Sequence, residues 1–265
     1  MSIFTQYYKE KENIGRLLVK CPNKRGIVAA LSKFLFDHGA DIIESSQYSS
    51  DDESNMFYIR FEYYCEDLLE KREQMENDFN KLAEEFLMDY DFTYKKNRKR
   101  SAIFVSKEIH CLLELLWEWQ SGDLDTDIPL VISNHETARE IVEPLGIPYY
   151  YIPANKDIRK EVEAKQIELM EKYDIDIHHS FLPAFIGARP YERAYERGVK
   201  LIGATSHYVT NDLDEGPIIE QDIERVDHRD NIPTLKKIGQ QVERRVLARA
   251  VKWHLQDRII VKDNK

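Results

Sequence analysis

Residues 102–119 read AIFVSKEIHCLLELLWEW and contain the strand–helix pattern from which the fold class is predicted. The apolar run at 102–105 predicts a strand. Apolar side chains at helical spacing over 109–119 predict a helix, with Leu112, Leu113 and Leu116 on one face. Because strands and helices continue to alternate, the sequence predicts an α/β fold with a doubly wound, mostly parallel sheet. The further strands are expected at 128–132, 149–152, 175–177, 199–207 and 217–226, and the helices at 136–143, 156–173 and 232–255.

A basic run at 95–100, KKNRKR, divides the chain. The elements before it follow the β–α–β–β–α–β order of a ferredoxin-like domain. In the strand at 56–64, every second residue from Phe57 to Tyr63 is apolar or aromatic, which predicts one buried face. With about 150 residues per domain, a chain of this length predicts two domains. We expect them at 1–95 and 101–265, joined by a linker at 96–100, with first-domain strands at 15–20, 41–48, 56–64 and 92–94 and helices at 27–38 and 68–87.

Composition excludes several classes of protein. The net charge of −10 argues against a nucleic-acid partner, which requires a basic surface. The ten glycines form no G-x-G or Walker A pattern, so neither a dinucleotide nor ATP is expected. No run approaches about 18 apolar residues, and we expect a cytoplasmic protein with no membrane partner. The isolated cysteines Cys21, Cys65 and Cys111 are expected to be reduced and buried.

Two polar segments follow strands and form the candidate site. They read DIHHSFLP at 176–183 and HYVTNDLDEGP at 207–217. Asp176 and His178 point to the same face of a strand, and Asp214 can orient an imidazole or a water molecule. A histidine that moves protons, a carboxylate that holds it and an oxyanion donor are what acyl-group hydrolysis requires.

Other interpretations of these segments remain open. A histidine at a strand end is often a hydrogen-bonded structural residue, and DEG at 214–216 is an ordinary turn sequence. A metal site made of His178, His179, His207 and Asp214 is disfavoured, because adjacent histidines on a strand face opposite sides and no H-x-x-x-H is present. A serine nucleophile at Ser180 lacks the G-x-S-x-G turn.

Four segments identify a family that the chain resembles. They are SKE at 106–108 with HCL at 110–112, VISNH at 131–135, HHSFLPAFIGAR at 178–189 and AYERGVKLIGATSHYVTNDLDEGP at 194–217. The chain resembles formyltetrahydrofolate deformylases, which have an N-terminal ACT domain followed by a formyltransferase-type domain. The resemblance implies hydrolysis of 10-formyltetrahydrofolate to formate and tetrahydrofolate, which supplies formate for purine synthesis. It implies no metal and no nucleotide or other cofactor.

The resemblance also assigns roles to residues. The family's catalytic trio is Asn, His and Asp. His178 and Asp214 match the last two, and Asp176 stands at the Asn position. By resemblance, His178 stabilises the tetrahedral intermediate and moves a proton, and Asp214 orients the attacking water. His207 matches a second pocket histidine, and Thr210 and Asp212 belong to the loop along the pterin.

The N-terminal part implies a regulatory role and further partners. ACT domains pair across subunits and bind an amino acid at their interface, so the resemblance implies a homo-oligomer. The loop CPNKRG at 21–26 is the corresponding strand–helix connection, in which Asn23 and Gly26 border the expected effector site. Helix N-terminal N–H groups can hold a carboxylate there. An ordinary capped turn is an equally good reading of this loop.

One segment favours water as the acceptor of the formyl group. Relatives that transfer the group to a phosphorylated amine carry a Gly- and Ser-rich loop after the first strand, whose N–H groups hold phosphate. Here that position reads SKEIH at 106–110, with no glycine and an added carboxylate. We therefore expect a phosphorylated acceptor to bind poorly.

Two departures from the family pattern define alternative functions. Asp176 replaces an oxyanion-binding amide. In addition, EKYD at 171–174 runs directly into the His178 motif, where relatives carry a further strand, loop and helix. We expect the strand at 174–178 to take the vacated place, which would keep the sheet continuous and shift the catalytic register. The alternatives are a catalytically impaired ACT-containing homologue that acts in binding or oligomerisation, and a folate-dependent formyltransferase with an amine acceptor.

Overall fold

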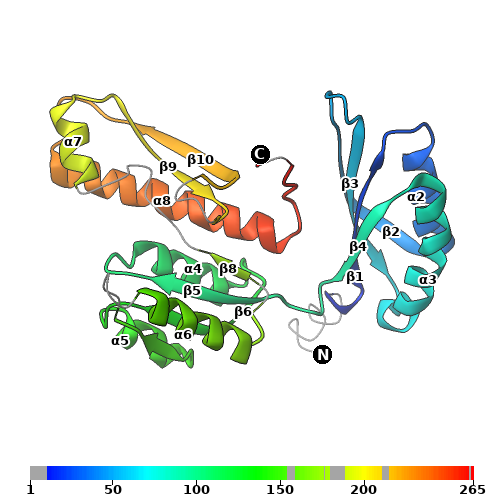
Figure 1. The fold of residues 1–265 in the computed structure, drawn as a ribbon, viewed down its shortest axis with the longest axis horizontal. Coiled ribbons are helices and arrows are strands. Elements are labelled where there is room, and N and C mark those ends of the chain that lie inside the picture. The colour runs from blue at the N-terminus through cyan, green and yellow to red at the C-terminus, as the bar shows by residue number, and fades with distance from the viewer. Residues whose placement is uncertain (1–10, 154–158, 176, 180–188, 211–214, 263) are drawn as a thin grey trace. The chain divides into compact units, whose positions relative to one another are not determined.

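The computed structural model describes residues 11–153, 159–175, 177–179, 189–210, 215–262 and 264–265. The chain divides into two compact units, Met1–Arg98 and Lys99–Lys265 (Figure 1). The boundary between the units falls within the basic run at 95–100.

The first unit has one antiparallel sheet in the strand order β2-β3-β1-β4. Helices α2 and α3 lie together on one side of this sheet (Figure 1). The predicted β–α–β–β–α–β order is confirmed. The elements are β1 (Ile14–Pro22), α2 (Ile27–Asp37), β2 (Ala40–Ser49), β3 (Met56–Cys65), α3 (Leu68–Phe86) and β4 (Asp89–Tyr94).

The core of the first unit lies between the sheet and its two helices. The apolar spacing of α2 places Ile27, Leu31, Phe34 and Leu35 on the buried side. Phe34 meets Phe79 of α3 edge-to-face, with ring centroids 5.0 Å apart. The packing of these helices on the sheet therefore follows from the helical periodicity of the sequence.

Strand β3 differs from its prediction, because both of its faces are largely covered. Tyr58 and Arg60 are buried, although they alternate with the core-facing residues. β3 is a central strand, so its neighbours shield the second face. Arg60 donates to Glu44 at 3.0 Å and to Glu62 at 2.6 Å. Burial opposes ionisation of Glu62, but Arg16 and Arg60 outweigh it and hold the pKa of that carboxyl below its usual value.

The second unit contains a four-stranded parallel sheet in the order β7-β6-β5-β8. One buried cluster joins this sheet to α4 and α5, and another joins it to α6, so helices cover both faces. The elements are β5 (Arg100–Val105), α4 (His110–Ser121), β6 (Asp127–Ser133), α5 (Arg139–Val142), η1 (Glu143–Leu145), β7 (Tyr149–Tyr151), α6 (Arg159–Lys172), β8 (Ile177–His179), α7 (Pro190–Glu196), β9 (Leu201–His207), β10 (Ile218–Arg225) and α8 (Ile232–Leu255).

Strand β8 pairs in parallel with β5, so the strand that carries His178 belongs to the main sheet. The prediction of one continuous sheet is wrong, however. β9 and β10 pair with each other as a separate antiparallel sheet, and among the described residues neither pairs with β8. A strand of three residues offers a short ladder on its outer side. The described residues of the second unit therefore form two sheets.

Helix α8 connects the two sheets. Val242 and Val246 pack on Ala204 of β9, while Leu247 and Val251 pack toward Leu115 of α4. The helix begins where the side chain of Asn231 accepts a hydrogen bond from the N–H of Thr234 at 3.0 Å.

On α4, the buried face is rotated from the predicted one. Leu112, Leu115 and Leu116 are buried, whereas Leu113 is 42% exposed. Because α8 covers the side of α4 that carries Leu115, the prediction that Leu113 faces the core is wrong.

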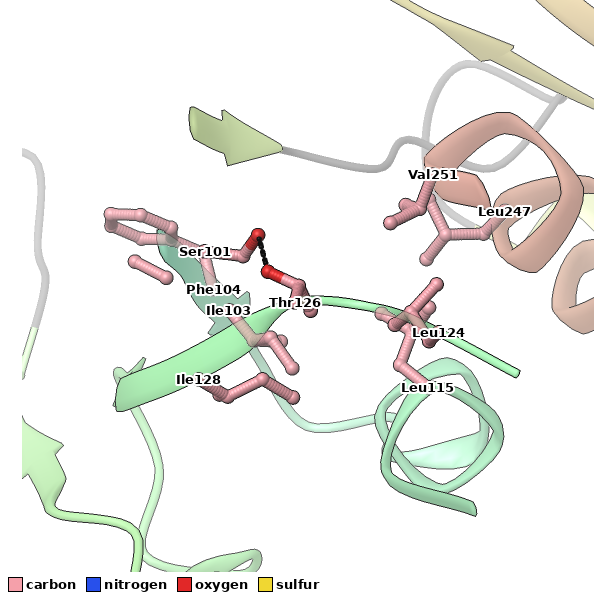
Figure 2. A pocket seen from close by; sticks show the side chains of 10 residues that line it. Ser101, Ile103, Phe104, Leu115, Leu124, Thr126, Ile128, Leu247 and Val251 are labelled. Carbon is pink, nitrogen blue, oxygen red and sulfur yellow. Dashed lines mark hydrogen bonds between the residues drawn. The ribbon is translucent and has the colours of Figure 1, made fainter. Parts of the chain in front are cut away.

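A small cavity of about 40 Å³ separates β5 from α8 (Figure 2). Leu247 and Val251 of α8 approach it from one side, and a 2.7 Å hydrogen bond between the hydroxyls of Ser101 and Thr126 lies at another part of its wall (Figure 2). The remaining lining is apolar, and the cavity marks a gap between α8 and this strand.

Two further expectations concern cysteines and membranes. Cys21, Cys65 and Cys111 are free thiols. Cys21 and Cys65 are buried, but the expectation of burial is wrong for Cys111, which lines the cleft described below and is only partly covered. Burial raises the pKa of both buried thiols. Across the described part of the chain, every helix is too short or too polar to serve as a membrane span.

Candidate functional site

A cleft of about 560 Å³ opens at the carboxyl end of β5. The carboxyl end of a parallel strand is the usual place for a ligand in such sheets. Its walls come from the 106–108 segment, the first turn of α4, the first turn of α7 and the middle of α8. The polar residues that line it are Ser106, Lys107, Glu108, His110, Arg189, Tyr191, Glu192, Lys236, Gln240 and Glu243.

Glu243 is the centre of a hydrogen-bonded group in this cleft. It is only 5% exposed and lies on α8. One carboxylate oxygen is 2.6 Å from Nε2 of His110, and the other accepts the hydroxyl of Tyr191 at 2.6 Å. Burial, followed by the bond to Glu243, raises the pKa of Tyr191, so its phenol stays protonated. A single buried carboxylate thus joins α4, α7 and α8.

The same place brings together three metal-ligand types. Atoms of His110, Cys111 and Glu243 all lie within 4.8 Å of one another. The 2.6 Å between His110 Nε2 and Glu243 Oε2 is a hydrogen-bond length. Two ligands on tetrahedral zinc, with bonds of about 2.0–2.1 Å, would lie roughly 3.3 Å apart. Burial also raises the pKa of Cys111 to about 12, which keeps it a thiol. The geometry is that of a hydrogen-bonded pair.

Gly239 makes the contact between Tyr191 and Glu243 possible. A Cβ at position 239 would lie 2.2 Å from the hydroxyl oxygen of Tyr191 and 2.4 Å from Cε1 of its ring. These distances are far shorter than a van der Waals contact. The glycine therefore leaves the space through which α7 reaches the buried carboxylate of α8.

Glu108 forms a second polar group at the cleft. Its Oε1 accepts a hydrogen bond from Nζ of Lys236 at 2.9 Å, and its Oε2 accepts one from Nε2 of Gln240 at 3.0 Å. The bond to Lys236 is the main reason that the pKa of Glu108 lies below its usual value. Glu108 is therefore an ionised carboxylate at neutral pH.

The loop between β9 and β10 is tightly closed at its base. The N–H of Tyr208 donates to the carbonyl of Pro217 at 2.9 Å. A Cβ at Gly216 would lie 1.6 Å from the carbonyl oxygen of Tyr208, so only glycine fits there. Nδ1 of half-buried His207 lies 2.9 Å from the same carbonyl oxygen. The base of the predicted pterin loop is thus fixed by main-chain contacts.

The structure describes only part of the predicted site. His207 ends β9, Thr210 is exposed in the following loop, and His178 lies within β8, its main chain paired beside Ala102. Asp176, Asp212 and Asp214 lie outside the described residues. The structure therefore does not bring His178 and His207 onto neighbouring strands of one sheet.

The predicted effector loop is described. Gly26 precedes α2 with φ of 94°, a conformation that favours glycine, and no side chain caps the helix. The N–H of Asn23 donates to the carbonyl of Asn55 at 2.8 Å. Asn23 therefore ties this loop to the turn before β3.

The sequence did not single out the buried group of His110, Tyr191 and Glu243. His110 belongs to a segment that carried the family resemblance, but its partners follow 81 and 133 residues later. Neither Tyr191 nor Glu243 belongs to a spacing pattern. The one available signal was a glutamate on the apolar side of a long amphipathic helix, where an acidic residue needs partners.

Comparison with known proteins agrees with this fold. The sequence model of the formyl transferase family matches residues 162–251. The formyltetrahydrofolate deformylase of Bacillus subtilis (strain 168) is 59% identical over 285 residues, covering 98% of this chain and 95% of that protein. The crystal structure of a formyltetrahydrofolate deformylase from Pseudomonas syringae has a TM-score of 0.87 at 39% identity, covering 100% of this chain and 98% of that one. At 24% identity, glycinamide ribonucleotide transformylase 1 from Symbiobacterium toebii shares the fold, with a TM-score of 0.56, covering 65% of this chain and 94% of that one.

The second unit therefore has the α/β formyltransferase fold, and its cleft lies at the carboxyl end of a parallel strand. The chain as a whole belongs to the formyltetrahydrofolate deformylase family. The alignment with the Bacillus subtilis relative spans 285 positions against the 265 residues here, so at least 20 positions of the relative have no counterpart in this chain. This difference agrees with the predicted loss of a segment.

Proposed function

We propose that this chain hydrolyses 10-formyltetrahydrofolate to formate and tetrahydrofolate. The observation that carries the proposal is family membership over nearly the whole chain, at 59% identity to one deformylase. The His178 and Asp214 motifs are both present in the sequence. The reaction consumes water and the formylated folate, and the proposal includes no metal or other cofactor.

The proposed reaction has two steps, the attack of water on the formyl carbon and the cleavage of its bond to N10. Asp214 orients a water molecule, whose oxygen attacks the formyl carbon while His178 takes up its proton. The tetrahedral intermediate then collapses and the bond between the formyl carbon and N10 breaks. The proton returns to N10, which leaves formate and tetrahydrofolate. A histidine that works as base and then as acid is the usual agent for such a transfer.

The direct test is formate release from 10-formyltetrahydrofolate by the purified full chain, with His178→Ala and Asp214→Asn beside it. We expect turnover by the parent chain and loss of turnover in both variants, with unchanged circular dichroism. Equal rates in parent and variants would remove these residues from the mechanism.

One observation favours a second candidate, a homologue that binds or oligomerises without turnover. β8 pairs within the body of the sheet, and β9 belongs to a separate sheet. His178 and His207, which the family resemblance places in one pocket, therefore come from different sheets. No formate release by the parent chain or by Asp176→Asn, together with intact folding, would support this candidate.

For the first unit, we propose an ACT domain with a small-molecule effector. Its strand order and paired helices agree with that fold. The uncapped first turn of α2 and the positive φ of Gly26 favour a carboxylate ligand at this loop. Thermal-shift screening of single amino acids against the full chain and Asn23→Ala tests the proposal. A ligand that shifts both proteins equally does not bind there.

We also propose that the first unit mediates homo-oligomer formation through β2. In the described sheet, β2 is an edge strand that pairs only with β3. Ile43 is 55% exposed on it, at a register irregularity between Ile42 and Glu44. An exposed apolar edge is a ready surface for pairing with another strand. Sedimentation of Ile43→Lys is expected to show a smaller species than the parent, and an unchanged mass would reject this edge.

A further inference from the structure

The carboxylate of Glu108, which lines the cleft, accepts hydrogen bonds in the way that a bound anion would. Both oxygens of Glu108 are engaged by residues one turn apart on α8, with Lys236 Nζ at 2.9 Å and Gln240 Nε2 at 3.0 Å. Residues four apart on a helix share one face, so these two donors point the same way. Glu108 itself comes from the segment that follows β5, more than 120 residues earlier in the sequence.

The two donors form an arrangement that suits an anion. An ammonium and an amide that converge from one helix face can hold a phosphate oxygen pair as readily as a carboxylate. Lys107 and Arg189 also line the cleft and add positive charge to it. The acidic residues that line it are Glu108, Glu192 and Glu243, and Glu243 is already bound by His110 and Tyr191.

We propose that Glu108 is a specificity-determining residue: its carboxylate occupies the anion-binding position of Lys236 and Gln240 and thereby excludes acceptors that carry a phosphate group. An acceptor of the class of phosphorylated amines would have to displace this carboxylate and bring two negative charges together. Water meets no such barrier. The inference rests on the proposed hydrolysis and specifies why the formyl group goes to water.

The removal of Glu108 is expected to affect anion binding more than folding stability. The side chains of Glu108 and Lys236 are each about half exposed. An exposed ion pair contributes little to stability, so removal of Glu108 is not expected to unfold the chain. Removal of Glu108 affects the binding of an anion more strongly. The charge of Lys236 is then no longer neutralised, and the carboxylate no longer repels the anion.

The test is a binding measurement that needs no turnover. Inorganic phosphate and glycinamide ribonucleotide are titrated by calorimetry, at low ionic strength, into the full-length parent chain, Glu108→Gln, and the double variant Glu108→Gln/Lys236→Gln. Glu192→Gln is the matched control, because it removes a negative charge that also lines the cleft. Circular dichroism and thermal unfolding monitor the fold of each protein.

We expect Glu108→Gln to bind both anions at least about tenfold more tightly than the parent, which corresponds to about 1.4 kcal/mol. The double variant should lose this gain, and Glu192→Gln should stay close to the parent. Equal binding by the parent and Glu108→Gln, or an equal gain in Glu192→Gln, would overturn the proposal. Because binding is measured directly, absence of formate release would count against the proposed hydrolysis and leave the anion result readable.

Discussion

His178 lies beside Ala102 in the parallel β5–β8 ladder, three residues before β5 ends at Val105. At about 3.3 Å per residue, this is roughly 10 Å short of the carboxyl edge of the sheet. Ligands of such sheets bind beyond that edge. The position of β8 along β5 therefore decides how far the main chain of His178 lies from the edge where such sheets bind ligands.

Asp176→Asn is expected to raise the rate of formate release. The family resemblance places an amide at position 176, where it donates to the developing oxyanion, and an ionised carboxylate cannot donate. One oxyanion donor typically contributes about 10²–10³ in rate, so we expect a gain of about that size in kcat. Formate release under saturating substrate measures it. Asp174→Asn, two residues earlier, is the control, and an equal gain there would point to a general charge effect.

Gly216→Ala is expected to lower activity more than stability. The new Cβ would overlap the carbonyl oxygen of Tyr208, so the base of the loop that carries Asp214 must move. A displacement of about 1 Å can reduce a rate by about 10²-fold. Gly198→Ala is a control for the added methyl group without a clash: Gly198, unlike Gly216, has a positive φ, and nothing lies within 4 Å of the added atom. Formate release is compared with urea unfolding, and equal losses of activity would reject the loop argument.

Tyr191→Phe is expected to destabilise the second unit. The change removes a hydrogen bond to buried Glu243 while the ring stays in place against Gly239. An unsatisfied buried acceptor costs about 1–3 kcal/mol, which urea unfolding resolves. Tyr195→Phe on the same helix removes the hydroxyl of a residue that is 49% exposed and should change stability by less than about 0.5 kcal/mol. Equal effects of the two changes would contradict a specific role for Glu243.

The folded chain is expected to become less stable as the pH decreases, because the fold opposes protonation of His254. Burial, followed by the charge of Lys99, lowers its pKa from the usual 6.5, and its Nδ1 lies 2.7 Å from the Tyr208 hydroxyl. Asp257 acts in the opposite direction but does not reverse the shift. Below pH 6.5 the unfolded chain binds a proton that the folded chain resists, so the free energy of unfolding decreases as pH falls from there toward the lower folded pKa.

His254→Gln should flatten this decrease when urea unfolding is measured between pH 7.5 and pH 5. His228→Gln changes an exposed histidine and serves as the control. A parent and a His254→Gln variant with the same pH slope would assign the effect to other groups.

Periodicity predicted most elements, because local apolar spacing determines which face of a helix or strand is buried. The bounds of α8, predicted at 232–255, illustrate this. Leu113 was misplaced because only the packing of α8 on α4 selects between neighbouring leucines. Helix α7 was not predicted, since seven residues give too little periodicity.

Long-range relationships were not predictable from spacing. The pairing of β9 with β10 in a separate sheet is a contact between segments that local periodicity does not specify. Glu243 and Tyr191 meet only where α7 packs against α8. The roles of Asp176, Asp212 and Asp214 stay predictions, because these positions lie outside the described residues.

Two sheets in the second unit also mean two sets of slowly exchanging amide protons. The β9–β10 hairpin and α8 are close in sequence and share buried contacts, so they can open and close as one cooperative segment. The strands of the parallel sheet are farther apart in the sequence, and they pack in separate hydrophobic clusters with α4, α5 and α6. Amide hydrogen exchange should therefore resolve two protection classes, with β9, β10 and α8 exchanging together and β5, β6 and β7 following a different opening free energy.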